Sequence, residues 1–345
     1  PDALPIDPQV TPFPGGRCTK CGSEKISGDV DVMDTWNTSA LTPQICANWP
    51  HDGEVKLPMS MRPQAHDIIR TWAFYTIVKA YYHQNTIPWK EIVISGHALA
   101  GRGEKFSKSK GNTPTDPQEL LKQVPADAIR YWAANGRLGL DTIFDPEQFK
   151  TGQRLITKLW NAFRFCKEHI VAGGEAPADV PDLDAVNKWI LHRYHETLCA
   201  YLKEFGAYEY SHALATAERF FWSDFCDNYL ELIKERLFNP ERHDAETIAA
   251  TRYALYEVGL GILKLFAPIL PHVTDAIFRD VFAQNEGVKS LHAVKFQSER
   301  YQVHTYPEAA ELLGHIVTIV GKVRKLKSEH SISLKTPLSE LSIGC

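Results

Sequence analysis

The chain has 345 residues, of which 44% are hydrophobic and 23% are charged, and its formal net charge at pH 7 is -4. These values exclude a disordered chain and a strongly basic one, so any contact with nucleic acid must come from local clusters of lysine and arginine. No apolar run approaches the length of a membrane span, which predicts no membrane partner. Seven cysteines without a disulfide-like pattern, and no secretory signal, favour a cytoplasmic location.

The first 30 residues are rich in proline and glycine and contain Cys18 and Cys21 in a Cys-x-x-Cys spacing. Two thiolates at this spacing supply half of a tetrahedral zinc site, which normally has four ligands. No second pair of this kind follows in the chain. We therefore interpret Cys18 and Cys21 as a half site for Zn²⁺.

Two aromatic segments follow. Valines at positions 30 and 32 predict the start of a short strand, which leads into a polar turn with Trp36. Residues 62–84 predict a helix, in which Ile68 and Trp72 lie four positions apart on an apolar side. From the residues alone, Ile68 and Trp72 are ordinary core residues, and Asp67 is a helix cap.

A cationic loop comes after the next strand. Residues 91–95 are apolar and β-branched and predict a short buried strand that ends at Gly96. Residues 105–112 then read Lys-Phe-Ser-Lys-Ser-Lys-Gly-Asn. A cationic loop beyond the carboxyl end of a strand lies where open α/β sheets bind ligands, and ammonium groups suit a triphosphate. The alternative interpretation is a solvated basic loop.

The second half of the chain predicts an antiparallel helical bundle. A turn-rich connector over 114–125 leads to a helix that opens at residue 126, with Asp127 as its cap. Amphipathic helices are expected from residue 147 and over 183–205, 211–238 and 244–266, and short connections between them are typical of a bundle. A basic helix follows near the carboxyl end, with four cations: Lys322, Arg324, Lys325 and Lys327.

The helix from residue 147 has two stripes at three- and four-residue steps. One is apolar and predicts a core face: Leu155, Leu159, Ala162 and Cys166. The other is polar and basic: Lys150, Arg154, Lys158 and Asn161. It is either a solvated face or a surface that contacts RNA.

Several motifs resemble one enzyme family. Residues 105–109 resemble the Lys-Met-Ser-Lys-Ser signature of class I aminoacyl-tRNA synthetases, with Phe106 in place of methionine. The stretches 29–43, 126–132, 158–165 and 221–229 resemble the valyl members of that family, in the family's order. The chain has neither the His-x-Gly-His motif nor the large editing insertion. It therefore resembles the carboxyl-terminal portion of a valyl-tRNA synthetase, without the first half of the catalytic domain and without the editing domain.

The resemblance implies roles for particular residues. Lys105 and Lys108 would be catalytic and would hold the triphosphate of ATP with Ser107, Ser109 and Asp67, and Mg²⁺ would accompany ATP. A pocket for the side chain of L-valine would be lined by Trp36, Ile68 and Trp72. Contacts with tRNA(Val) would come from the basic stripe: Lys150, Arg154, Lys158, Asn161 and Arg164. Near Asp67 the chain departs from the family, because Ala65 stands where the family usually has glycine.

The resemblance also implies the fold and the activity. The expected class is α/β, a partial Rossmann-like catalytic half followed by an all-α anticodon-binding helical bundle. The expected order is a remnant of a zinc-bearing insert (1–30), the second catalytic half (31–112), a connector (113–146), the bundle (147–310), and a basic helix that leads into the first strand of a carboxyl-terminal α/β unit (311–345). The whole enzyme would convert valine into valyl-adenylate and transfer it to tRNA(Val), and this chain alone would be inactive in activation. The alternative is a non-catalytic tRNA-binding paralogue.

Overall fold

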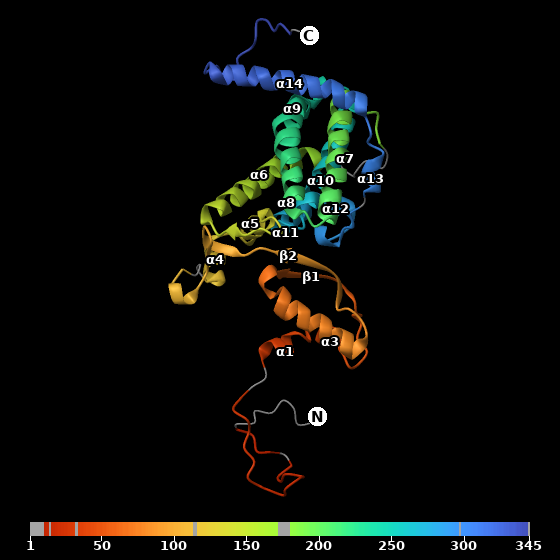
Figure 1. Cartoon of the computed structure of the whole chain (residues 1–345). Helices are drawn as coiled ribbons and strands as arrows, with labels where there is room; N and C mark the ends of the chain where they lie inside the picture. Colours follow the sequence, from red (N-terminus) through yellow and green to blue (C-terminus); the bar gives the residue numbers. More distant parts are fainter. Residues whose placement is uncertain are drawn as a thin grey trace. The chain divides into compact units, whose positions relative to one another are not determined.

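The computed structural model describes residues 10–13, 15–31, 34–112, 116–171, 180–296 and 298–343. The chain divides into two compact units, Pro1–Ser95 and Gly96–Cys345 (Figure 1). Among the described residues, no helix has both the length and the apolar character needed to cross a membrane.

The first unit contains a parallel β-α-β arrangement. Strands β1 (Met59–Ala65) and β2 (Trp89–Ser95) pair in parallel, with Met59 opposite Trp89 and Ala65 opposite Ser95. The connection runs through η1 (His66–Ile68), η2 (Ile69–Ala73) and helix α3 (Phe74–Gln84). A helical crossover between parallel strands is the repeating unit of Rossmann-like sheets.

The structure corrects one boundary in this unit. The predicted strand over 91–95 is confirmed, but the helix predicted from residue 62 begins only after Ala65. Residues 62–65 belong to β1, where Pro63 lies opposite Val93. A proline donates no backbone hydrogen bond and is tolerated on a strand at the edge of a sheet. The apolar spacing of residues 68–80 therefore does not extend to the amino end of the predicted helix.

Short helices precede the sheet. Asp34 caps α1 (Thr35–Ser39) by accepting a hydrogen bond from the backbone N–H of Trp36, and α2 (Thr42–Cys46) follows. The indole N–H of Trp72 donates to the carbonyl of Ser39 over 3.0 Å. Residues 29–31 form no strand, and Val32 lies outside the described residues. The strand expected at Val30 is therefore wrong for the part that the structure describes.

The second unit begins with a small sheet. Strands β3 (Ala98–Gly101) and β4 (Glu104–Lys105) form an antiparallel hairpin, and β5 (Thr142–Ile143) pairs in parallel with β3. The basic loop therefore leaves this hairpin and does not directly follow the longer strand β2. It contains a short turn, η3 (Lys108–Lys110). Helix α4 (Pro117–Gln123), with Asp116 as its cap, lies within the connector over 114–125, which the sequence predicts to be rich in turns.

The rest of this unit is helical, as predicted. The main helices are α5 (Ala126–Asn135), α6 (Pro146–Val171), α7 (Ala185–Gly206), α8 (Tyr210–Arg219), α9 (Leu230–Phe238), α10 (Ala245–Phe266), α11 (Pro271–Val281) and α14 (Pro307–Glu329). A π-helical segment, η4 (Phe220–Tyr229), lies between α8 and α9, and the shorter elements are η5 (Pro240–Arg242), α12 (Ala283–Glu286), η6 (Leu291–Ala293) and α13 (Glu299–Gln302). Helix α10 is buried along nearly all of its length, and the predicted core face of α6 lies against the same core. The predicted helix over 211–238 is one rod, in which the π-helical η4 joins α8 to α9.

Asp127 has a different structural role from the expected one. Pro125 is at the cap position of α5, and the buried Asp127 carboxylate instead accepts from the backbone N–H groups of His272 and Val273, at 3.2 and 2.8 Å. It therefore caps α11. Arg130 of the same helix donates to the carbonyls of Pro268 and Ile269. These side chains bind α5 to the turn between α10 and α11.

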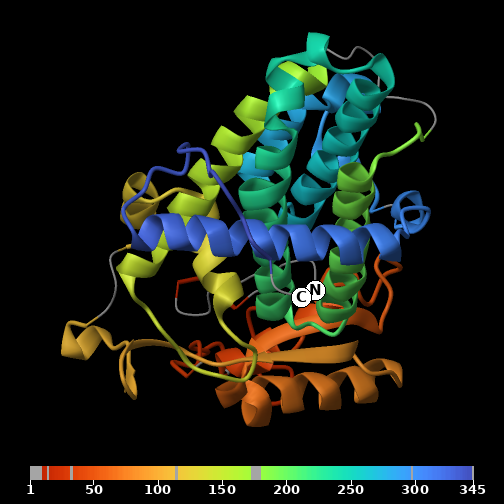
Figure 2. The same ribbon diagram turned by 90° about the horizontal axis from the view of Figure 1, so that it is seen from above.

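Helix α14 crosses the other helices of the bundle (Figure 2). Its first half packs on α7 through the core residue Leu313, and the backbone N–H of Tyr306 donates to His192 over 3.0 Å. In its second half, Arg324 donates to the carbonyl of Asp227 in η4 over 2.8 Å. The described residues 331–343 form turns and irregular backbone, so the strand expected in this segment is absent there.

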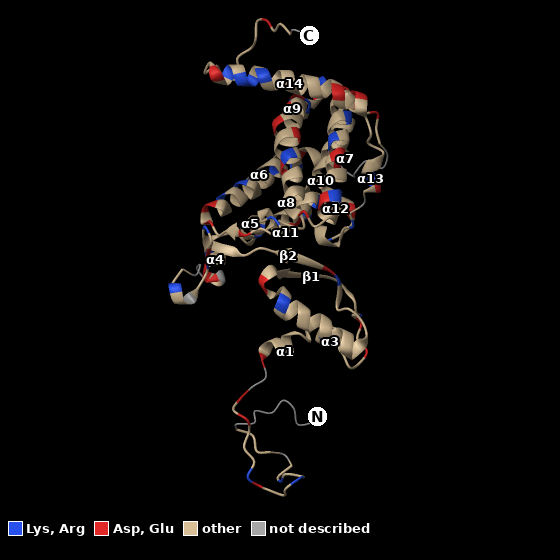
Figure 3. Ribbon diagram, viewed as in Figure 1, with Lys and Arg blue, Asp and Glu red and all other residues tan. Residues whose placement is uncertain are grey.

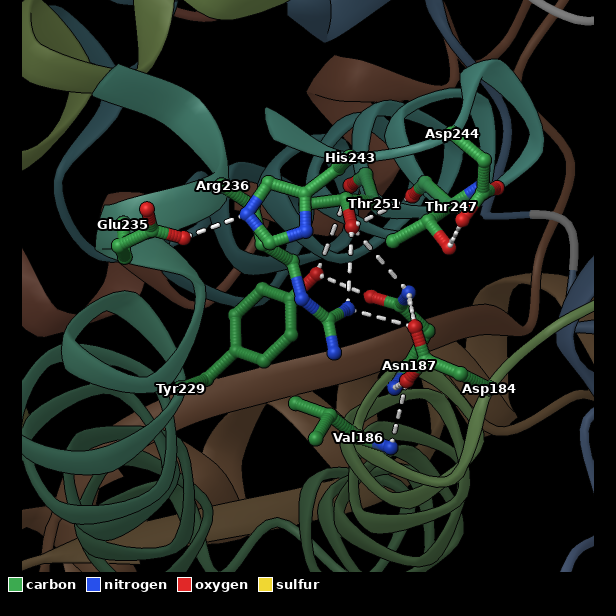
Figure 4. Close-up of polar contacts among 10 residues, drawn as sticks. All are labelled: Asp184, Val186, Asn187, Tyr229, Glu235, Arg236, His243, Asp244, Thr247 and Thr251. Atoms are coloured by element: carbon green, nitrogen blue, oxygen red, sulfur yellow. Dashed lines mark hydrogen bonds and ion pairs between the residues drawn. The ribbon is translucent and has the colours of Figure 1, made fainter. Parts of the chain in front are cut away.

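A partly buried polar network joins three helices at one end of the bundle (Figure 4). Asp184 caps α7 and binds Arg236 of α9 over 2.5 Å. Asn187 is fully buried, donates to Asp184 over 2.9 Å and accepts from the hydroxyl of Tyr229 over 2.9 Å. Thr251 of α10 lies within 3.4 Å of both Asn187 and Arg236. Because its members are satisfied by one another, the network fixes the relative positions of α7, α9 and α10.

Candidate functional site

The basic loop presents its first lysine to solvent. Lys105 is exposed, and its Nζ lies 3.0 Å from Nε2 of His97. Ser107 and Ser109 share a hydrogen bond of 2.8 Å between their hydroxyls. The side chain of Lys108 lies outside what the structure describes. The loop therefore brings Lys105, Ser107 and Ser109 into one short segment.

Phe106 fixes this loop to an aromatic cluster. Its ring meets Phe144 edge to face, with the ring centroids 5.9 Å apart. Phe144 in turn contacts Trp132 and Phe149 at 5.4 and 5.5 Å. Such edge-to-face pairs add to the stabilisation that comes from burial alone. The aromatic side chain at position 106 is thus accommodated by neighbours of its own kind.

The three residues predicted for a valine pocket lie in the first unit. Trp72 is 5% exposed, stacks on Trp89 with a centroid distance of 5.3 Å, and carries the guanidinium of Arg62 over its ring at 3.9 Å. Ile68 packs against the same cluster. Trp36 is 36% exposed and belongs to α1, whose last residue accepts the hydrogen bond from Trp72. The surroundings of Trp72 are those of a core residue.

Asp67 is exposed on η1 of the same unit, and it follows Ala65, the last residue of β1. Cys18 and Cys21 lie in the amino-terminal segment. Hydrogen bonds from the backbone of Cys21 and Lys20 lower the pKa of the Cys18 thiol, which favours the thiolate that binds zinc. Among the described residues, no three His, Cys, Asp or Glu side chains come together as metal ligands. The amino-terminal segment thus supplies two thiols, and the described residues form no complete zinc site.

The predicted RNA-binding stripe divides in two. Lys150 pairs with Glu147 at 2.7 Å near the start of α6, while Arg154 and Arg164 are exposed. Lys158 and Asn161 instead line hollows on the bundle surface. Figure 3 shows the basic residues of α6, and further basic residues gathered in the second half of α14.

Two adjoining hollows lie between α6, η4, α9 and α14. The smaller has a volume of about 280 Å³ and is lined by Lys158, Asn161, Ala162, Phe165, Cys226, Leu230, Glu231, Lys234 and Phe238. The larger, about 840 Å³, shares Lys158, Cys226 and Glu231 with it and is bordered by α14 and the tail that follows. The larger hollow is lined by aliphatic side chains, cations and the acids Asp227 and Glu231, whereas the smaller one has aromatic rings.

Sequence reasoning missed most residues of the smaller hollow. Phe238 is 60% exposed, and its ring contacts Phe165 at 5.8 Å and His169 at 6.0 Å. Lys234 and Glu231 come from the same helix and pair at 3.2 Å. The sequence signal that could have revealed Phe238 is an aromatic residue at the polar end of a helix, next to Asn239-Pro240. Lys158 adds a cation–π contact with Trp222 at 5.3 Å.

Two family models match the chain. The model "tRNA synthetases class I (I, L, M and V)" matches residues 10–145, and "Anticodon-binding domain of tRNA ligase" matches residues 187–342. Among solved structures, LeuRS agnB2 of Agrobacterium radiobacter K84, in ternary complex with tRNA and LeuAMS, superposes with a TM-score of 0.63 at 15% identity, covering 83% of this chain and 35% of that one. Mycobacterium tuberculosis methionyl-tRNA synthetase, bound by methionyl-adenylate, gives 0.52 at 19% identity, covering 66% and 47%. The fold and the helical bundle are thus those of the class I tRNA synthetases.

Curated relatives indicate which class I tRNA synthetases the chain is similar to. The valine–tRNA ligase of Rickettsia conorii is 39% identical over 99% of this chain, and that of Ehrlichia ruminantium (strain Welgevonden) is 41% identical over 99%. The chain spans 42% and 41% of the length of these two relatives. Within class I, the chain is therefore similar to the valine–tRNA ligases, of which it matches a part.

Proposed function

We propose that this chain contributes two parts of a valine–tRNA ligase. One is the basic loop of residues 105–112, called the lysine–serine loop below, which binds ATP. The other is the helical bundle, which binds the anticodon arm of tRNA(Val). The whole enzyme would join L-valine to the tRNA through valyl-adenylate. The observation that carries the proposal is the smaller hollow, because it combines aromatic rings, cations and an amide in the unit that contains the anticodon-binding match.

The chemistry of the hollow suits an unpaired nucleobase. Phe238 offers an exposed ring for stacking, and Asn161 offers an amide that can pair with the edge of a base. Lys158 and Lys234 lie at the same hollow and suit the flanking phosphates. Sequence-specific recognition of RNA targets unpaired loop bases, which an anticodon loop presents.

The loop suits a triphosphate. Lys105 is exposed, and its ammonium can turn away from its neighbour His97 toward an anion. When bound, Mg²⁺ would neutralise part of the phosphate charge. Lys105 and Lys108 would then stabilise the negative charge that builds on the departing pyrophosphate.

The test of the bundle is RNA binding measured by fluorescence anisotropy. The chain should bind an anticodon stem-loop of tRNA(Val), and the affinity should fall steeply as salt rises. Phe238→Ala should weaken binding by about fivefold or more, because stacking of a base on an aromatic ring contributes about 1–3 kcal/mol.

Trp160→Ala is the matched control, because Trp160 is an exposed aromatic residue of α6 that lies outside both hollows. It should bind as the wild type does. Equal affinities for wild type and Phe238→Ala would remove the hollow from the account. Absence of any binding at low salt would contradict the RNA-binding role itself.

A further inference from the structure

One amide side chain joins the two ends of the lysine–serine loop. We propose that Asn112 is a positioning residue, which holds residues 104–112 in the shape that presents Lys105 to the phosphates of a nucleoside triphosphate. The inference rests on the proposed ATP-binding role of this loop.

Asn112 uses its whole amide group within the loop. Its Oδ1 accepts a hydrogen bond from the backbone N–H of Ser107 over 2.8 Å. Its Nδ2 donates to Oε1 of Glu104 over 3.1 Å and to the backbone carbonyl of Lys105 over 3.3 Å. An asparagine amide has one carbonyl and two N–H groups, so each part of it has a partner here. We call this set of contacts the Asn112 clasp.

The loop needs such a clasp because Gly103 precedes it and Gly111 lies within it. Gly103 and Gly111 have φ angles of +70° and +65°, and a Cβ added at either would meet nothing within 4 Å. Glycine in open space has the largest conformational freedom to lose when a loop is ordered. Among the described residues, the other contacts that hold the loop are the two-residue strand β4, the bond from the N–H of Lys110 to the carbonyl of Ser107, and the ring of Phe106, together with the side-chain contacts Ser107–Ser109 and Lys105–His97.

The clasp holds the backbone on both sides of Phe106. It fixes the carbonyl of Lys105 and the N–H of Ser107, while the Lys105 ammonium stays exposed beside His97. A charged group that is already in place costs less entropy when it binds an anion than one on a disordered loop. The Asn112 clasp should therefore raise the affinity for polyphosphate without touching the ligand.

The test exchanges donor and acceptor across the clasp. Asn112→Ala removes all three hydrogen bonds, whereas Asn112→Asp combined with Glu104→Gln rebuilds two of them, to residue 104 and to the N–H of Ser107, and loses the one to the carbonyl of Lys105. In this double variant the introduced glutamine amide would donate to the introduced aspartate carboxylate, which would still accept from the N–H of Ser107. The rebuilt pair keeps the wild-type net charge. Asn239→Ala is the control, since Asn239 is a half-buried asparagine at the end of α9 whose side chain donates to Glu235.

Two readouts on the whole chain, labelled with ¹⁵N-serine, distinguish a missing clasp from a missing ligand site. Inorganic tripolyphosphate should bind the wild type, bind Asn112→Ala about fivefold more weakly, and bind the rebuilt pair with an affinity between these two, because the rebuilt pair restores two of the three hydrogen bonds. Amide hydrogen exchange of Ser107 should be about fivefold faster in Asn112→Ala and return to the wild-type rate in the rebuilt pair. The melting temperature should stay unchanged throughout, because the clasp lies in an exposed loop.

Equal tripolyphosphate affinities in wild type and Asn112→Ala, or equal exchange rates at Ser107, would overturn the positioning role and leave the proposed function standing. Failure of the wild-type chain to bind tripolyphosphate would overturn the ATP-binding role of the loop and this inference with it. The exchange rates of Ser107 would then still show whether the clasp exists.

Discussion

Acidification should destabilise the bundle through His304. This residue is fully buried and connects α13 to α14. Its ring nitrogens lie 3.2 Å from the hydroxyl of Tyr253 and 3.4 Å from that of Tyr306. Burial lowers the pKa of His304 from 6.5 to about 4, and the positive charges of His195 and Arg300 act in the same direction.

The direction of this change in stability with pH follows from proton binding. Between pH 6.5 and 4 the unfolded chain binds a proton at His304 and the folded chain does not, so the stabilisation is complete above pH 6.5 and is lost as the pH falls. One pKa unit corresponds to about 1.4 kcal/mol. For these two pKa values the loss between pH 7.5 and pH 5.0 is about 2 kcal/mol.

The assay is urea unfolding followed by circular dichroism at 222 nm, which reports mainly on the helical bundle. His304→Gln keeps groups that donate and accept hydrogen bonds but does not titrate in this range. The variant should lose about 2 kcal/mol less than the wild type between the two pH values. His315→Gln, an exposed residue of α14, is the control and should behave like the wild type. Equal losses in wild type and His304→Gln would refute the reasoning.

Three further substitutions test the packing by urea unfolding. Asp127→Ala should lower the free energy of unfolding by about 1–3 kcal/mol, because two N–H groups of α11 lose their acceptor. Asp116→Ala, at the exposed cap of α4, should lower it by about 1 kcal/mol or less. Equal losses would contradict the role of Asp127. Lys264→Met should leave stability unchanged or raise it, since the buried Nζ has no hydrogen-bond partner among the described residues and burial lowers its pKa; a loss above about 1 kcal/mol would contradict this. Asn187→Leu should cost about 2 kcal/mol or more, because it leaves the hydroxyl of Tyr229 without its closest acceptor, and a neutral result would contradict the network in Figure 4.

The helices of the bundle were predictable because hydrophobic periodicity reports which face a helix buries. Leu155, Leu159 and Cys166 recur at helical spacing, and all three lie in the core. Pattern reasoning failed where tertiary contacts decide. Asp127 opens a helix in the sequence, but its carboxylate serves a helix about 145 residues later in the chain. No local pattern contains that partner.

The candidate site was predictable only where its residues are continuous in the sequence. The loop with Lys105 is a continuous motif, so its charge pattern is visible in the sequence. The smaller hollow is not continuous: Lys158, Cys226 and Phe238 come from α6, η4 and α9 and meet only after the bundle has formed. The Asn112 clasp was missed because its carbonyl and amide partners are decided by backbone geometry that residue types do not specify.

The most direct test of the central claim is valine-dependent exchange of pyrophosphate into ATP. The chain is assayed alone and together with a polypeptide that supplies the first nucleotide-binding half of a valine–tRNA ligase. We expect no exchange by the chain alone, exchange when the two are combined, and loss of that exchange with Lys105→Ala. A combination that folds and binds tRNA(Val) but exchanges no pyrophosphate would contradict the claim and favour a non-catalytic tRNA-binding paralogue.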